Sequence, residues 1–375
     1  MNSSSSALDM ANGNKNTRFH DIKMLELPRL QVDRQFFDVR LLASGWYTKI
    51  FVARHVKAQD KVVLKCVQKG TTQKEDFFRE FHYNYYLSPH PNIVKSFHVP
   101  FDTNSSYVFA MELAPAGDLS QFVRRGGIGE EKTKKVVEQI ASALEFVHSK
   151  DLVHRDVTLD NILVFDEEMS RVKLSDFGNT QRMGTFVKKV NVRISCAPPE
   201  VRKAICDDGY CVQSSHDAWQ LGILIFVCLM GSYPWSSADI TDRHYKSWVA
   251  WLKHKTTKAP PRFKCFTPRL LRLLRQLLEP RPEKRFGVKE VHKFMSDPWL
   301  VKGMDPYDIC FDDASSEILE TSATSLFKFA EKKLAELLRT YLHQADHCGE
   351  PRRRKHVRFA PEVEENDRER EATVP

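Results

Sequence analysis

"HRDVTLDNILVF", His154 to Phe165, places a His-Arg-Asp triplet between two short apolar segments. An Asn, Asn161, follows five residues after the Asp, Asp156. Short runs of Val, Leu and Ile favour β-strands, so these polar groups are expected on a loop between strands. A carboxylate can accept a proton, and an amide oxygen suits a hard metal ion. The stretch therefore predicts a chemical site, and the rest of the chain indicates which reaction it serves.

Two further groups precede this loop in the sequence. Lys65 lies in VVLKC, a stretch typical of a strand, from which its ammonium could hold phosphate oxygens. Glu80 lies in a helix-like segment over residues 73–87 and could orient that ammonium. Glu75 is an alternative in the same segment, but the distance to HPNIV at residues 90–94 favours Glu80.

A third acidic group, Asp176, opens the DFG triplet after the loop. Phosphoryl transfer needs positioned phosphates, magnesium to neutralise charge, and a base near the acceptor hydroxyl. Asp156 fits the base, Asn161 and Asp176 fit the magnesium ligands, and Lys65 fits the phosphate contact. These groups occur in the right order along the chain, and together they indicate phosphoryl transfer.

The motif order resembles that of eukaryotic protein kinases, whose catalytic loop is H-R-D-L-x-x-x-N. The resemblance covers about Phe36 to Leu300 and implies protein substrates, with ATP and Mg²⁺ as cofactors. It also implies that Asp217 braces the catalytic loop. The segments RVKLSDFG, FVKKVNVRISCAPPEV and LGILIFVCLMGSYPW are most similar to the Src-homology-3-binding-domain kinase family of serine/threonine kinases. A buried ion pair between Glu200 and Arg285 is a further implication.

The resemblance places a nucleotide site in the first half of the chain. The Gly-rich loop retains only its middle glycine, and this loss favours weaker ATP binding because glycines let backbone N–H groups approach phosphate. Met111 would be the gatekeeper residue. The implied contacts to the loop, the adenine and the ribose are Leu42, Ala43, Gly45, Ile50, Met111, Glu112, Ala114 and Asp118.

Secondary-structure signals predict an α+β fold with two lobes. The kinase-like region, 36–302, divides into a β-rich N-lobe at 36–112 and a larger helical C-lobe at 115–302. Residues 1–30 are polar and predicted to be disordered. Residues 303–375 form a C-terminal extension with an amphipathic helix near 325–344 and a charged, disordered tail.

Composition excludes several classes of protein. The eight cysteines show neither a disulfide framework nor zinc spacing, and the start of the chain lacks the pattern of a secretory signal. The longest apolar run, Leu221 to Met230, is too short to cross a membrane. The net charge is +8, but no nucleic-acid module accompanies it. We expect a monomer that binds neither nucleic acid nor membrane and is located in the cytoplasm, with the nucleus as an additional compartment.

The activation segment, Asp176 to Glu200, departs from the family pattern. Alignment from Glu200 puts Lys189 where many relatives carry a phosphothreonine, so Arg155 lacks the phosphate that it would otherwise bind. Two interpretations stay open. The segment is ordered without phosphorylation, or Thr185 is a shifted phosphorylation site.

A second departure is Thr158, where serine/threonine kinases usually carry a Lys. The Thr that normally contacts that Lys aligns with Arg193. One hypothesis is that the positive charge has moved across the cleft, which makes Arg193 a catalytic residue of an active serine/threonine kinase. The alternative is drift in a pseudokinase that acts as a protein-interaction scaffold.

The tail carries KHVRF, Lys355 to Phe359, which fits the basic-x-Val-x-Phe docking motif for type-1 protein phosphatase. Such a segment adds a strand to its partner and buries two apolar side chains. The alternative is a basic tail or nuclear-localisation patch in RRRK, Arg352 to Lys355.

Overall fold

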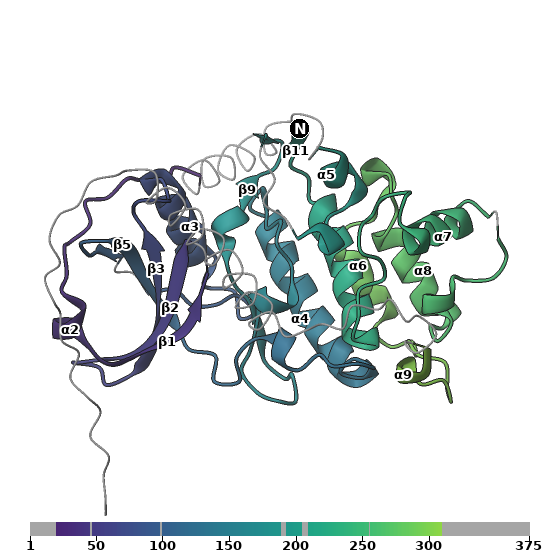
Figure 1. The fold of residues 1–375 in the computed structure, drawn as a ribbon, viewed down its shortest axis with the longest axis horizontal. Helices are drawn as coiled ribbons and strands as arrows, with labels where there is room; N and C mark the ends of the chain where they lie inside the picture. Colours follow the sequence, from purple (N-terminus) through teal and green to yellow (C-terminus); the bar gives the residue numbers. More distant parts are fainter. Residues whose placement is uncertain are drawn as a thin grey trace, which may run out of the picture. The chain divides into compact units, whose positions relative to one another are not determined.

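The N-lobe is built on a five-stranded antiparallel sheet (Figure 1). The computed structural model describes residues 20–309, except for residues 46, 98–99, 189–192, 205–208 and 255. The strands are β1 (Phe36–Ser44), β2 (Thr48–His55), β3 (Lys61–Gln68), β4 (Phe101–Asp102) and β5 (Ser106–Glu112), in the order β1-β2-β3-β5-β4. The predicted small β-rich lobe is therefore confirmed.

Strand β3 forms the centre of this sheet and positions Lys65. Successive side chains of a strand point to opposite faces, so Val63, Lys65 and Val67 share one face. Val63 and Val67 pack into the core beneath α3. The register places Lys65 opposite Ile50 on β2 and Phe109 on β5. The Lys65 side chain therefore starts from the rigid middle of the sheet.

Helix α3 (Lys74–Leu87) packs against the sheet, close to the predicted range of 73–87. The Phe77 and Phe81 rings lie 6.0 and 5.8 Å from the ring of Phe109 on β5. Glu80 lies between them in sequence and is buried with them. Aromatic packing thus fixes the helix so that Glu80 points inward.

The C-lobe is helical, as predicted (Figure 1). Its amphipathic helix α4 buries Val136, Val137, Ile140, Leu144 and Val147, the residues of the predicted apolar stripe. The helices of the C-lobe are α4 (Glu130–His148), α5 (Pro199–Ala204), α6 (Ser215–Met230), α7 (Arg243–Leu252), α8 (Pro268–Leu277) and α9 (Pro306–Ile309). The N-lobe has a one-turn helix, α2 (Val32–Gln35), before its first strand. Short 3₁₀ turns are η1 (Leu119–Gln121), η2 (Leu159–Asn161), η3 (Phe177–Asn179), η4 (Ile194–Cys196), η5 (Pro261–Phe263), η6 (Pro282–Lys284) and η7 (Val288–Phe294).

Helix α6 contains the longest apolar run and lies in the core of the C-lobe. Every residue from His216 to Met230 is buried, which confirms the expectation of a buried helix. Gly231 ends the helix with a φ of +72°, and a Cβ there would lie 1.9 Å from the Arg124 carbonyl oxygen. No helix among residues that the structure describes is long and apolar enough to cross a membrane.

Three two-stranded sheets hold the loops of the C-lobe. They pair β6 (Leu152–Val153) with β9 (Gln181–Arg182), β7 (Ile162–Val164) with β8 (Val172–Leu174), and β10 (Phe186–Val187) with β11 (Tyr210–Cys211). The catalytic loop, residues 154–161, runs between β6 and β7, and Asp176 follows β8 by two residues. The chemical residues therefore stand on loops whose two ends are anchored in sheets.

Glu200 and Arg285 form the predicted ion pair. Arg285 Nη1 and Nη2 donate to the two Glu200 carboxylate oxygens at 2.7 and 2.9 Å. Nη1 also donates to the Ser215 carbonyl at 2.9 Å. This bidentate contact ties α5, at the end of the activation segment, to the start of α6.

The N-terminal boundary differs from the prediction of disorder over residues 1–30. Leu30 N donates to the Asp102 carbonyl at 3.0 Å, and Asp102 N donates to the Pro28 carbonyl at 3.1 Å. Ile22, Leu27 and Leu30 also pack against the core, so the polar run at the start of the chain ends before residue 30. The predictions for residues 325–344, for RRRK and for KHVRF lie outside the described residues.

Candidate active site

Lys65 lies between two carboxylates, one on α3 and one in the DFG triplet. Its Nζ forms an ion pair with Glu80 on α3 and lies 2.9 Å from Asp176 Oδ1. Lys65 and Glu80 are buried, whereas Glu75 is exposed. The structure thus brings together three residues that the sequence predicted as partners, and it selects Glu80 over Glu75.

The electrostatics of this cluster keep Lys65 and Asp176 charged, whereas burial raises the pKa of Glu80 above its ordinary value. Burial by itself would lower the pKa of Lys65, but the Asp176 and Glu80 carboxylates outweigh it and raise that pKa above its ordinary value. Burial would likewise raise the pKa of Asp176, but Lys65 holds it below the ordinary value. An ammonium and an ionised carboxylate are the forms needed to bind phosphate and a metal ion.

Asp217 on α6 braces the catalytic loop, as the family resemblance implied. Its fully buried carboxylate accepts hydrogen bonds from the backbone N–H of His154 at 2.9 Å and of Arg155 at 2.8 Å. His148 Nε2 lies 2.8 Å from the same carboxylate. Arg155 has a φ of +70°, a strained conformation that this brace holds in place.

Asp156 follows directly and carries the carboxylate of the site. Asn161 Nδ2 donates to the Asp156 carbonyl at 2.9 Å, and Asn179 Nδ2 donates to Asp156 Oδ2 at 3.1 Å. Burial, reinforced by the charge of Asp176, raises the pKa of Asp156 above its ordinary value. Sequence reasoning missed Asn179, whose one signal is its place directly after the DFG triplet.

The donor set at Asn161 and Asp176 fits magnesium. No group of three or more His, Cys, Asp or Glu within the described part of the chain could hold a metal by itself. Magnesium usually takes one or two protein oxygens and completes its shell with water and substrate phosphates. Asp176 offers a half-exposed carboxylate, and Asn161 uses its amide nitrogen toward Asp156, which leaves its oxygen to meet a cation.

The residues expected at the Gly-rich loop surround the turn between β1 and β2. Leu42 and Ala43 lie on the exposed strand β1, and Ile50 is on β2. Gly45 N donates to the Thr48 carbonyl at 2.7 Å and closes the turn. A Cβ on Gly45 would meet only that carbonyl oxygen, at 3.5 Å, so the fold alone does not require glycine there. Close approach to a phosphate would be a reason for it.

The residues expected to contact adenine and ribose lie at the end of β5 and just after it. Met111 is buried, and Ala114 accepts a hydrogen bond from Gly117 N at 3.3 Å. The Glu112 carboxylate accepts from Lys173 Nζ at 2.6 Å. Asp118 caps η1 by accepting from Ser120 N at 3.0 Å. The carboxylate of Asp118 already has internal partners, and the nucleotide contacts of these residues stay a prediction.

Arg193 lies next to the catalytic loop. Its guanidinium forms an ion pair with Asp160, two residues after Thr158. Thr158 itself is buried and accepts a hydrogen bond from Asn161 N at 3.1 Å. The contact of Arg193 is therefore with the neighbouring carboxylate, and its catalytic role stays a prediction.

Asn84 is an unusual feature of α3, one turn after Glu80. Its side chain is completely buried, and within the described residues neither amide atom has a hydrogen-bond partner. The Ser96 hydroxyl is also buried and unpaired in that part of the chain. The Ser88 hydroxyl links them, donating to the Asn84 carbonyl at 2.7 Å and accepting from Ser96 N at 2.9 Å. Unpaired buried polar groups destabilise a fold, so the amide of Asn84 lowers the stability of the folded N-lobe around the helix that carries Glu80.

We expect Asn84→Leu to raise the free energy of unfolding by about 1 kcal/mol, because it removes two unpaired buried polar atoms without breaking a hydrogen bond. Urea unfolding followed by tryptophan fluorescence measures this. A matched control is Gln139→Met, since the Gln139 amide accepts from Val172 N at 2.9 Å and donates to the Met169 carbonyl at 2.9 Å. That control should lower stability. Equal losses in both variants would show that Asn84 is not a source of instability.

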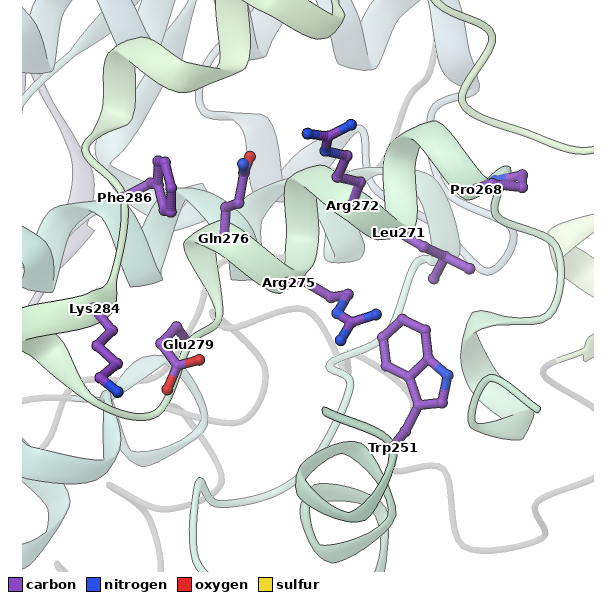
Figure 2. Close-up of a pocket in the computed structure, with 9 residues that line it drawn as sticks. All are labelled: Trp251, Pro268, Leu271, Arg272, Arg275, Gln276, Glu279, Lys284 and Phe286. Atoms are coloured by element: carbon purple, nitrogen blue, oxygen red, sulfur yellow. The ribbon is translucent and has the colours of Figure 1, made fainter. Parts of the chain in front are cut away.

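A separate hollow of about 550 Å³ lies in the C-lobe between α7 and α8. Figure 2 shows Arg275 directed toward Trp251, and the guanidinium carbon lies 4.8 Å from a ring centroid of Trp251. The hollow is lined by Trp251, Pro268, Leu271, Arg272, Arg275, Gln276, Glu279, Lys284 and Phe286. None of the predicted chemical residues line it, so the candidate active site rests on the cluster around Lys65 and Asp156.

Comparisons with known proteins agree with this geometry. The family model for the protein kinase domain matches residues 36–300. The chain is 42% identical over 289 residues to the serine/threonine-protein kinase meng-po of Drosophila melanogaster. The aligned part covers 76% of this chain and 63% of that protein. It is 40% identical over 278 residues to the serine/threonine-protein kinase SBK1 of Danio rerio, with 74% and 72% covered. SBK1 of Mus musculus is 39% identical over 279 residues, with 73% and 67% covered.

The matched part thus spans less than two thirds of meng-po and about two thirds or more of the two SBK1 proteins. It contains the sheet, the catalytic loop and the activation segment described above. The chain belongs to the protein kinase family and is an SBK-like serine/threonine-protein kinase.

Proposed function

We propose that the chain is an active kinase that transfers the γ-phosphoryl group of Mg-ATP to Ser or Thr hydroxyls of protein substrates. The observation that carries this proposal is the contact of Lys65 with both Glu80 and Asp176. Such a contact needs α3, β3 and the DFG segment to be in their working positions together. Asp156 stands on the braced loop and lies near Asp176. Burial and the charge of Asp176 together raise the pKa of Asp156.

Each residue has a defined task in this proposal. Lys65 holds the α- and β-phosphates, and Glu80 keeps its ammonium in place. Asp156 orients the substrate hydroxyl and accepts its proton as the hydroxyl oxygen bonds to the γ-phosphorus. The bond from that phosphorus to the oxygen bridging to the β-phosphate breaks, and ADP leaves. Magnesium held by Asn161 and Asp176 would neutralise the charge of the phosphates. Tight positioning on anchored loops supplies most of the rate in this type of reaction.

The test is incorporation of radiolabelled γ-phosphate by the purified chain, alone and with a generic acceptor protein. Asp156→Asn is the matched control because it keeps the size and shape of the side chain. Label in the wild type that is absent from the variant supports the proposal. Equal incorporation by both proteins would contradict it.

The pseudokinase hypothesis rests on two departures from the family pattern, Thr158 and the single glycine of the loop near Gly45. Thr158 replaces a Lys that would carry positive charge to the transferring phosphate, but the other five chemical positions are retained. The Lys65 contacts favour the enzyme, because a scaffold has no need for them.

We further propose that KHVRF, Lys355 to Phe359, docks to type-1 protein phosphatase by strand addition. Residues 345–375 fused to an affinity tag should retain the purified phosphatase. The double change Val357→Ala and Phe359→Ala should abolish retention, because it removes both buried anchors, whereas changing Arg352 and Arg353 to Ala should weaken it only slightly. Retention by the double variant would rule the motif out.

We also propose that the protein acts as a monomer in the cytoplasm, with RRRK directing part of it to the nucleus. The basic run supports the nuclear part, since such clusters serve as import signals. Light scattering of the purified protein and imaging of a tagged chain, with and without RRRK, test these points. A stable dimer, or an unchanged distribution without RRRK, would contradict them.

A further inference from the structure

The Arg155 side chain, next to the catalytic Asp156, is buried and hydrogen-bonded within the protein. Its Nε and Nη2 donate to the hydroxyl oxygen of Tyr210 at 3.0 and 2.8 Å. Its Nη1 donates to the Asn179 carbonyl at 2.7 Å. Arg155 is 6% exposed, and its guanidinium carbon lies 5.5 Å from the Tyr210 ring centroid. All three guanidinium nitrogens therefore have a neutral oxygen as partner.

Tyr210 is itself held firmly. It belongs to β11, whose register pairs it with Val187 of β10 inside the activation segment. Its ring is buried and lies 5.0 Å from the ring of His216 in an edge-on arrangement. Burial lowers the pKa of His216 to about 4, so this neighbour is neutral at physiological pH. Burial likewise raises the pKa of Tyr210, so its hydroxyl stays protonated.

The contact connects the activation segment to the catalytic carboxylate. Arg155 N is fixed by Asp217 at 2.8 Å, while the side chain reaches Tyr210 and Asn179. Asn179 in turn donates from Nδ2 to Asp156 Oδ2 at 3.1 Å. A continuous set of hydrogen bonds thus runs from β11 through Arg155 and Asn179 to Asp156.

We propose that Tyr210 is a positioning residue for phosphoryl transfer that takes the place of an activating phosphate on the activation segment. This inference rests on the proposed kinase activity. In the family, an arginine at this place binds a phosphorylated residue, but here the alignment gives Lys189 at the phosphorylated position. Tyr210 and Asn179 take three of the five guanidinium N–H groups of Arg155, which is buried, so a phosphate would have to compete with partners already in place. The catalytic loop is therefore set by a hydroxyl that is always present.

Tyr210→Phe removes the hydroxyl and keeps the ring. We expect kcat to fall about tenfold, because small displacements of a catalytic group lower rates steeply. KM for ATP should stay within about twofold, because the lost contact acts on the transferring step and not on nucleotide binding. The matched control is Tyr245→Phe, another buried tyrosine, which packs on Trp235 in the C-lobe core and should keep full kcat. Full kcat in Tyr210→Phe, or an equal loss in both variants, would overturn the inference.

A double-mutant cycle separates positioning from general damage. If Tyr210 acts through Arg155, the double variant Tyr210→Phe with Arg155→Met should have the same kcat as Arg155→Met alone. Multiplied losses would show independent roles and overturn the inference. The cycle uses the full chain, and each variant is compared by thermal melting to ensure that it is folded.

The state of phosphorylation supplies the second test. The chain is treated with a phosphatase, and intact mass confirms that no phosphate remains. Unchanged kcat supports the inference. If activity is lost and returns when Thr185 or Ser195 is phosphorylated, the inference is wrong while the proposed kinase activity stands. A wild-type protein that is inactive in both states would overturn the proposed function and this inference with it.

Discussion

Asp156→Asn is expected to lower kcat by about 10³-fold, the middle of the roughly 10²- to 10⁴-fold that a positioned general base contributes. The carboxylate is held by the loop that Asp217 braces, and Asn179 orients its Oδ2. An amide has the same shape but cannot accept the substrate proton. KM for ATP should change little, because Asp156 is not among the groups that hold the nucleotide.

The fold should not suffer from this change. Burial and the neighbouring Asp176 raise the pKa of Asp156, which means that its charge is unfavourable in the folded state. Replacing that charge with a neutral amide should leave the melting temperature unchanged or slightly higher. A steady-state assay with a saturating protein substrate, beside a thermal melt, measures both effects. Retained kcat in a folded variant would mean that Asp156 is not the base.

The five chemical positions could be predicted because each belongs to a short motif with fixed spacing. Lys65 in a strand, Glu80 in the next helix, and Asp156, Asn161 and Asp176 on anchored loops all have local signals. Their order along the chain then predicted that they form one active site. The structure places Lys65, Glu80 and Asp176 in contact as this argument requires.

The supporting residues could not be predicted in the same way. Tyr210 meets Arg155 across 55 positions of sequence, and Asn179 meets Asp156 across 23. Such contacts depend on how loops pack, and neither periodicity nor spacing encodes that. The unpaired amide of Asn84 could not be predicted from the sequence either. A helical pattern shows which side chains face inward, but not whether they find hydrogen-bond partners there.

Arg193 shows where a sequence argument points to a region of the fold without giving the contact made there. The exchange hypothesis placed it beside Thr158, and its ion pair is with Asp160 on the same loop. Asp160 neutralises part of the charge of Arg193 but also fixes its guanidinium beside the catalytic loop. A charge held in position before the reaction costs no reorganisation, which is the condition for stabilising a transition state. The ion pair is therefore compatible with a role in transfer.

If Arg193 supplies the positive group that the missing Lys once gave, Arg193→Ala should lower kcat by about 10²-fold, the lower end for loss of one preorganised donor. Its side chain is partly exposed, so folding should change little.

Thr158→Lys combined with Arg193→Thr restores the usual pair and should recover the activity lost in Arg193→Ala, since the new ammonium has Asp160 nearby. Thr158→Lys alone puts two cations together in a buried place and should not recover it. This non-additivity is what coupled residues show. Full kcat in Arg193→Ala would disprove the exchange and leave Lys65, Asp156, Asn161 and Asp176 to carry the chemistry alone.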